Sequence, residues 1–247
     1  MFQDVGGSDE SFMATNEPSK FPTQENLKLE HYLLPTAAID ADHPEVIAFA
    51  QEVVGSTQNP VSQASQLYLA VRDRIQYDPY KLDLSDSGMK ASRVLALGHG
   101  WCVTKSALLA AACRAVGIPA RVGYADVHNH LSTRRLREVI GSDTYYWHGY
   151  AALYLHGKWV KATPVFDFSL CQKLKMTPLE FDGISDSILQ ACDEHGNRHM
   201  EYLRMRGEYA DIPLAEMRIA FAQYYPKLMQ LNAANFEADV SDEILAR

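Results

Sequence analysis

The chain has 247 residues and a net charge of −8 at pH 7, with 47% hydrophobic and 22% charged residues. These values are typical of a globular protein that buries a sizeable core, as one large domain or two small ones. The acidic balance argues against non-specific binding to nucleic acid or to an anionic membrane, because both attract basic patches. The basic run at 134–137 is short and precedes Glu138, so we interpret it as a solvated loop or helix face.

Targeting and cysteine patterns narrow the class of protein further. The sequence has no apolar run of about 18 residues, so it predicts no membrane span. Its first twenty residues are acidic and lack the apolar centre of a secretory signal. The four cysteines show no C-x-x-C spacing, which argues against a zinc ribbon or a disulfide framework. We therefore expect a cytoplasmic protein without a cofactor, and the oligomeric state stays open.

The first part of the chain divides into a head and a series of helices. Residues 1–26 are polar and rich in Gly, Ser and Pro, and we interpret them as a flexible head. Residues 27–247 are interpreted as a single domain. Within it, 43–55 and 59–78 each place a proline after a polar residue and predict two helices. Residues 83–100 predict a loop, a short helix and a glycine-flanked turn.

The next predicted helix begins near Cys102 and ends before Gly117, with Pro119 just beyond it. Its many alanines make it thin, so it can be packed on several sides and we expect it to be central. Amide N–H groups and the dipole of its first turn favour a thiolate at Cys102 and could stabilise an oxyanion. This position favours a nucleophile over the alternative, a buried structural cysteine. Trp101, directly before it, could shield the site from water.

Strands follow this helix. Residues 118–127 are rich in β-formers and predict a strand, and 145–167 predict a hairpin whose turn is at 156–157. Residues 198–211 predict a further strand, and 214–228 a helix. Helices in series followed by strands indicate an α+β fold.

His148 is the candidate base for the thiol, because it begins a strand of the hairpin. The predicted turn places His148 opposite Val165, with Thr163 and Asp167 as diagonal neighbours on the same face. Asp167 could then accept a hydrogen bond from the imidazole and fix its tautomer. A turn or cap residue at the end of the strand is the open alternative for Asp167.

The segment at 125–132 contains a second histidine pair. His128 and His130 alternate as two metal ligands on one strand face would, but no third ligand follows at a fixed spacing, so we predict no metal site. We expect Asp126 and His130 to lie near the cleft and to contact substrate. Residues 133–143 are interpreted as an exposed connector.

Two segments, GWCVTKSALLAAACRAVGIPARVGYADV and WHGYAALYLHGKWVKATPVFD, resemble the transglutaminase-like superfamily of cysteine enzymes in content and in order. The resemblance covers about residues 65–170. It implies a papain-like core, in which a central helix bearing Cys packs on an antiparallel sheet bearing His and then Asp. Residues 171–247 resemble the C-terminal extension of bacterial transglutaminase-like cysteine proteases. We expect this extension to close over the cleft and to shape specificity.

The resemblance also implies roles for individual residues. Cys102 resembles the nucleophile and His148 the general base of a Cys-His-Asp triad. At the third position, Thr163 stands where the family has Asp. Either Thr163 orients His148 through its hydroxyl, or Asp167 supplies the carboxylate. We expect Asp167 to do so, with Thr163 lining the site together with Trp101.

These residues predict an enzyme that forms a thioester through Cys102 and hydrolyses a peptide or a small amide. Acyl transfer of the transglutaminase type stays open, since the fold alone does not decide between acceptors. The other alternative is a non-catalytic binding module that keeps the cleft. The threonine at position 163 makes that alternative credible.

Overall fold

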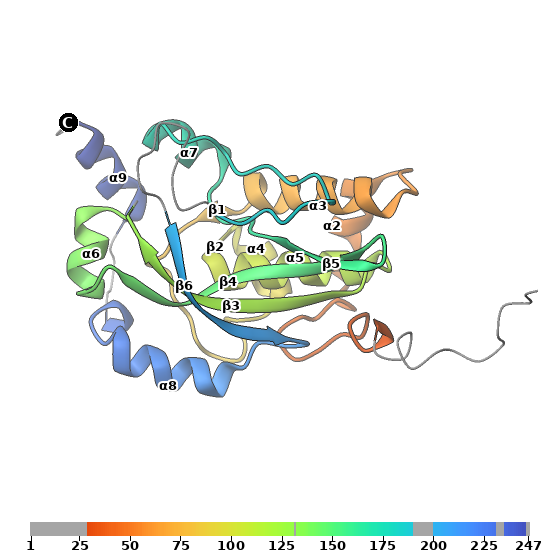
Figure 1. The fold of residues 1–247 in the computed structure, drawn as a ribbon, viewed down its shortest axis with the longest axis horizontal. Coiled ribbons are helices and arrows are strands. Elements are labelled where there is room, and N and C mark those ends of the chain that lie inside the picture. The colour runs from red at the N-terminus through yellow and green to blue at the C-terminus, as the bar shows by residue number, and fades with distance from the viewer. Residues whose placement is uncertain (1–28, 131, 190–199, 231–234, 246–247) are drawn as a thin grey trace, which may run out of the picture.

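The structure is a computed structural model that describes residues 29–130, 132–189, 200–230 and 235–245. The head predicted at residues 1–26 lies outside these ranges. The fold is α+β, as predicted, with helices packed around an antiparallel sheet (Figure 1). None of the described helices combines the length and the apolar composition that crossing a membrane requires.

The elements follow one another in the order helices first, then mainly strands, then helices again. The helices are α2 (Pro44–Val54), α3 (Pro60–Arg74), α4 (Ala91–Leu97), α5 (Cys102–Ala115), α6 (Arg134–Ile140), α7 (Phe168–Leu174), α8 (Leu214–Tyr224) and α9 (Phe236–Leu245), with a 3-10 turn at Leu228–Gln230. The strands are β1 (Gln76–Tyr77), β2 (His99–Gly100), β3 (Ala120–Asn129), β4 (Thr144–Leu155), β5 (Lys158–Ala162) and β6 (Met200–Tyr209).

The first two predicted helices are confirmed as α2 and α3, and each begins at its proline. The side chain of Asn59 caps α3, because its Oδ1 accepts hydrogen bonds from the N–H groups of Val61 and Ser62 at 3.0 and 3.1 Å. Helix α3 ends at Arg74, earlier than predicted. The next residues form β1, which pairs in parallel with β2 just before α5.

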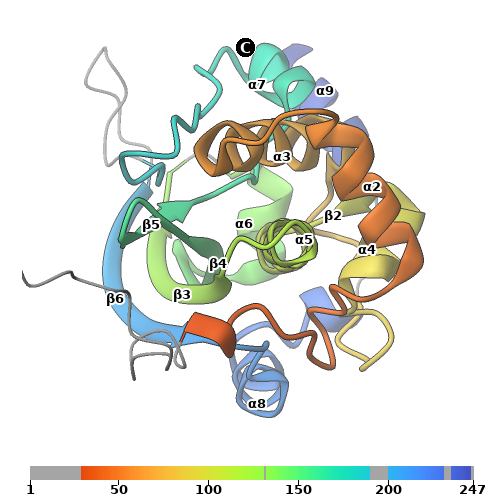
Figure 2. The ribbon, with the colours of Figure 1, turned by 90° about the vertical axis from the view of Figure 1, so that its right-hand side faces the viewer.

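Helix α5 is the centre of the molecule, as its alanine-rich sequence predicts. Every residue from Cys102 to Arg114 is buried. In Figure 2 the sheet curves around α5, and α2, α3 and α4 lie on the other side of it. Even Lys105 is fully buried, and its ammonium donates hydrogen bonds to the carbonyls of Arg72 and Ile75 at the end of α3. Burial lowers the pKa of Lys105 to about 7.

The main sheet has the strand order β5-β4-β3-β6, and each neighbouring pair is antiparallel. The predicted hairpin is confirmed as β4 and β5, with Leu155 opposite Lys158 and Ala151 opposite Ala162. Pairing stops there because β5 ends at Ala162. The expected pairing of His148 with Val165 is therefore wrong.

The connector predicted at 133–143 is instead the helix α6, and this correction has a physical reason. The hydroxyl of Thr133 accepts a hydrogen bond from Leu136 N–H at 3.2 Å, and Gly141 ends the helix with a φ of 72°. Leu136 and Ile140, four residues apart, form a buried stripe. This apolar pair, and not the basic residues beside it, determines that the segment packs as a helix.

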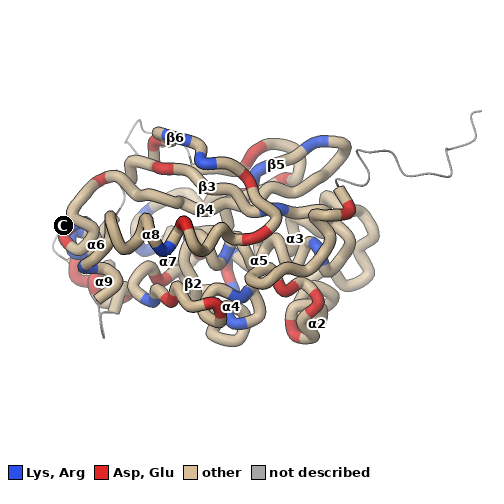
Figure 3. Tube along the Cα trace, turned by 90° about the horizontal axis from the view of Figure 1, so that it is seen from below, with Lys and Arg blue, Asp and Glu red and all other residues tan. Residues whose placement is uncertain are grey.

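Two of the three basic residues of α6, Arg134 and Arg135, face solvent and pair with carboxylates, whereas Arg137 is half-buried and donates to the carbonyl of Ser132. Arg134 lies 3.6 Å from Glu138, and Arg135 lies 3.3 Å from Asp239 of α9. Figure 3 shows Lys and Arg interspersed with Asp and Glu over this view of the chain. The run at 134–137 is thus a solvated helix face, one of the two readings the sequence allows.

Candidate active site

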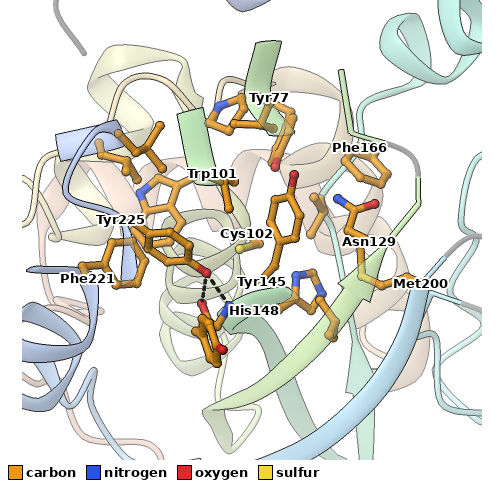
Figure 4. A pocket seen from close by; sticks show the side chains of 18 residues that line it. Tyr77, Trp101, Cys102, Asn129, Tyr145, His148, Phe166, Met200, Phe221 and Tyr225 are labelled. Atoms are coloured by element: carbon orange, nitrogen blue, oxygen red, sulfur yellow. Dashed lines mark hydrogen bonds between the residues drawn. The ribbon is translucent and has the colours of Figure 1, made fainter. Parts of the chain in front are cut away.

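Cys102 is the first residue of α5 and lies at the wall of a cavity of about 60 Å³ (Figure 4). Trp101 precedes it in an extended conformation, and its N–H donates to Thr104 Oγ1 at 3.1 Å. This bond satisfies an amide at the helix entry and fixes the first turn. Trp101 lines the same cavity and packs on Phe221 of α8, with ring centroids 5.4 Å apart.

The cavity is mainly apolar and aromatic. Its walls come from α5, β3, β4, α6, the loop after β5, β6, α8 and the 3-10 turn, so residues far apart in sequence meet there. The lining side chains are Tyr77, Pro79, Leu82, Trp101, Cys102, Val127, Asn129, Leu136, Ile140, Tyr145, Tyr146, His148, Val165, Phe166, Met200, Phe221, Tyr225 and Leu228. The C-terminal extension thus contributes four of them, Met200, Phe221, Tyr225 and Leu228, which agrees with the expected closure over the cleft.

His148 reaches this cavity because β4 passes unusually close to the start of α5. A Cβ added to Gly149 would lie 2.7 Å from Val103 Cα and 3.0 Å from Val103 N. Only glycine therefore allows this approach. The structure brings Cys102 and His148 together in one cavity, as predicted, although no hydrogen bond joins these two described side chains. Such bonds are often long until a substrate is bound.

A β-bulge in β4, directly before His148, sets the direction of the His148 side chain. Ala125 pairs with His148 and Val127 with Tyr145, so two residues of β4 oppose Asp126 alone. Trp147, within this bulge, has a φ of 62°, a strained value for a bulky residue. Strain of this kind is retained where surrounding groups hold it in place.

Asp126 holds the bulge instead of contacting substrate. Its Oδ1 accepts hydrogen bonds from Trp147 N–H at 3.3 Å and from Arg206 Nε. Arg206 also lies over the Trp147 ring, 4.8 Å from the centroid. Asp126 is buried and is not among the cavity-lining residues. The expectation that Asp126 contacts substrate is therefore corrected, because its carboxylate accepts hydrogen bonds from Trp147 of β4 and Arg206 of β6.

The thiol and the imidazole are both neutral near pH 7. Burial raises the pKa of Cys102 to about 11, against the opposing effect of the amide N–H groups of Gly149, Val103 and Cys102 itself. Burial also lowers the pKa of His148 to about 4. The amide N–H groups at the start of α5 thus lower the pKa of Cys102, as predicted, but desolvation raises this pKa by more. The expected resting thiolate is therefore wrong for this buried thiol.

Asp167 is the N-cap residue of α7, and its carboxylate accepts hydrogen bonds there. Its Oδ1 accepts hydrogen bonds from Leu170 N–H at 3.0 Å and from Ser169 Oγ at 2.7 Å, and its Oδ2 accepts from Tyr77 N–H at 3.1 Å. Burial opposes ionisation, but these bonds lower the pKa of Asp167. The cap role, left open by the sequence, is the one observed. Asp167 is not brought to His148, because β5 ends before the position that would align them.

Tyr202 of β6 lies beside His148 instead, and the Thr163 hydroxyl neighbours Tyr202. His148 Nε2, Thr163 Oγ1 and the Tyr202 hydroxyl are all buried without a hydrogen-bond partner among the described residues. The rings of His148 and Tyr202 meet edge to face, with centroids 6.1 Å apart. Burial raises the pKa of Tyr202, and the neighbouring Thr163 hydroxyl opposes that rise. Tyr202 lies in β6, so no local sequence signal links it to His148.

The remaining predicted contact, His130, lies just after β3 and does not line the cavity. Its Nε2 is 3.7 Å from Glu201 Oε1 of β6. The alternate residue Asn129 faces the cavity in its place. Successive strand residues point to opposite faces of the sheet. The prediction that His130 lies on the cavity face is therefore wrong, because Asn129 lies on that face.

Residues 47–164 match the family model described as the Transglutaminase-like superfamily. A solved structure from Cytophaga hutchinsonii, named a "putative cysteine protease", aligns at 16% identity with a TM-score of 0.44, covering 74% of this chain and 55% of its own. One from Parabacteroides distasonis, named a "putative protease", aligns at 16% identity with a TM-score of 0.37, covering 55% and 25%. The chain thus spans about half or less of either protein, and it matches no curated protein.

Proposed function

Since residues 47–164 belong to the transglutaminase-like superfamily, we propose that the protein is a cysteine-dependent hydrolase of a peptide or small amide. The observation that carries the proposal is the shared cavity, into which Cys102 and His148 both project (Figure 4). Acyl transfer needs a nucleophile and a base, and both line this mainly apolar cavity.

The reaction begins with a neutral pair. His148 takes the proton of the Cys102 thiol as the sulfur attacks the amide carbonyl, and the carbonyl oxygen becomes an oxyanion. The N–H groups of Cys102 and Val103, at the start of α5, are available to stabilise that oxyanion. His148 then gives its proton to the leaving amine, and a thioester remains on Cys102. Water hydrolyses the thioester to a carboxylic acid and restores the thiol.

The lining of the cavity suggests the kind of acyl group. Aromatic and aliphatic side chains dominate its walls, and few polar groups are available to recognise a charged substrate. We infer that the acyl side of the substrate is apolar or aromatic. Phe221 of α8 and Tyr225, directly after that helix, would contact it, because they line the cavity on the side of the extension.

A non-catalytic binding module is the second candidate, and two observations favour it. Thr163 replaces a carboxylate, and the buried thiol of Cys102 is un-ionised at rest. Such a module would bind an apolar peptide in the same cavity without forming a covalent intermediate.

Trapping of the acyl-enzyme separates the two functions. The p-nitrophenyl ester of N-acetylphenylalanine should add one acyl group to the peptide that contains Cys102, as seen by mass spectrometry. Hydroxylamine should remove that group, since it cleaves thioesters, and Cys102→Ala should not acquire it. Saturable binding of the amide analogue without an adduct on Cys102 would identify the binding module and reject the hydrolase.

The group that orients His148 can be tested by two substitutions. Thr163→Val removes a buried hydroxyl that neighbours Tyr202, the residue beside His148, with little change in shape, and we expect kcat to fall about tenfold or more. Asp167→Asn keeps a side chain that can cap α7, so kcat should stay within about twofold. Steady-state kinetics across pH 4 to 9 measure both. A larger loss in Asp167→Asn would return the orienting role to that carboxylate.

A further inference from the structure

A second cluster of ionisable side chains lies at the edge of the sheet, outside the cavity. His128 is in β3, His130 follows that strand directly, and Glu201 lies in β6. The sheet register places Glu201 directly opposite His128. Two histidines and one glutamate thus face the same side, from two neighbouring strands.

The three side chains are close enough to share one ion. Their nearest ligand atoms, one from each residue, all lie within 4.8 Å of one another. Two ligand atoms bound to one zinc ion at about 2.1 Å lie roughly 3.4 Å apart in a tetrahedral site. Small side-chain rotations would therefore bring all three to bonding distance. The imidazoles are already nearly parallel, with ring centroids 4.5 Å apart.

One atom in the cluster points to a missing partner. His130 Nε2 is buried and has no hydrogen bond, although Glu201 Oε1 lies 3.7 Å away. That separation is too long for a hydrogen bond but is close to the separation of two ligands that share one cation. Buried polar atoms are ordinarily satisfied, so this nitrogen has a coordination position to offer a ligand.

We propose that His128, His130 and Glu201 bind one divalent transition-metal ion of the zinc class. Two imidazole nitrogens and one carboxylate oxygen are ligands that zinc and its neighbours prefer over calcium or magnesium. Asp143 lies close by, with Oδ2 3.8 Å from His128 Nε2, and it or water completes the coordination. The backbone carbonyl of Asp143 also accepts a hydrogen bond from Asn129 N–H at 3.0 Å, which ties it to β3.

The position of this site makes it a link between strands. Asn129 and Met200, which pair with each other and alternate with the ligands, line the cavity on the other face. The ion therefore lies on the face of the strands opposite the Cys102 thiol. It joins β3 to β6 beside the wall of the cavity, and it stabilises that wall without taking part in acyl transfer.

Metal binding is measured on the full chain after dialysis against EDTA, by calorimetric titration with zinc chloride and by visible absorption with cobalt chloride. We expect one ion per chain and a rise in Tm on binding. His130→Ala should weaken binding by more than about 100-fold, since loss of even an outer partner of a ligand costs 10–100-fold. Glu201→Gln should weaken it in the same direction and tests the site with a smaller change in shape.

Two control variants make the result specific. His156→Asn removes an exposed imidazole from the hairpin turn, where asparagine tolerates the φ of 49°, and it should bind zinc like the parent. Cys102→Ser should also bind normally, which excludes capture of the ion by the thiol. The proposal is overturned if the parent binds no zinc, if His130→Ala binds it as well as the parent, or if Cys102→Ser loses it. None of these outcomes depends on whether the protein hydrolyses amides.

Discussion

Cys102→Ala is expected to abolish amide hydrolysis and to leave the Tm near that of the parent. The sulfur is the proposed nucleophile, so its removal leaves no atom to form the thioester. Loss of one member of a catalytic unit lowers kcat by about 10⁴-fold or more. Alanine fits the first turn of α5 without strain, because the neighbouring contacts at Gly149 involve backbone rather than the Cys102 side chain. Steady-state kinetics and thermal unfolding measure the two properties separately.

Cys113 provides the matched control on the same helix. It is also a buried free cysteine, and burial raises its pKa, but it does not line the cavity. Cys113→Ala should keep kcat within about twofold while it loses some packing stability. Turnover that survives in Cys102→Ala, or that disappears equally in Cys113→Ala, would remove Cys102 from the proposed mechanism.

The central helix and the hairpin were predictable because their signals are local. Glycines before Cys102, alanines after it and Gly117 at the end define α5 within one segment. The two-residue turn at 156–157 fixes the register of β4 and β5 over five residue pairs. Cysteine and histidine could be placed in one site from these elements and from their order.

The surroundings of His148 were not predictable, because they depend on contacts between distant segments. The bulge at Trp147 is held by Arg206 of β6, and the ring beside the imidazole belongs to Tyr202 of the same strand. The point where β5 stops decides the role of Asp167, and element ends are poorly marked in sequence. The pKa of Cys102 likewise depends on how completely the cavity is closed, which no local pattern encodes.

His148→Gln is expected to lower kcat/KM by about 10⁴-fold at pH 7 and to change the shape of the pH profile. Glutamine fills a similar volume but does not accept the thiol proton. The variant must then rely on the thiolate, and a thiol with a pKa of about 11 is ionised in roughly one molecule in 10⁴ at pH 7. Its rate should therefore rise about tenfold per pH unit between pH 7 and 10.

The parent should behave differently over the same range. Its His148 is neutral above a pKa of about 4 and accepts the proton throughout, so kcat/KM should be flat from about pH 5 to 10. Below pH 4 the imidazole becomes protonated and the rate should fall as the pH falls. His99→Gln, a half-buried histidine outside the cavity, should keep the profile of the parent. Two results would contradict this assignment of the base. One is a rate in the parent that falls with decreasing pH near 6.5, and the other is a flat pH profile in His148→Gln. Either result would show that the buried, neutral imidazole of His148 does not accept the thiol proton.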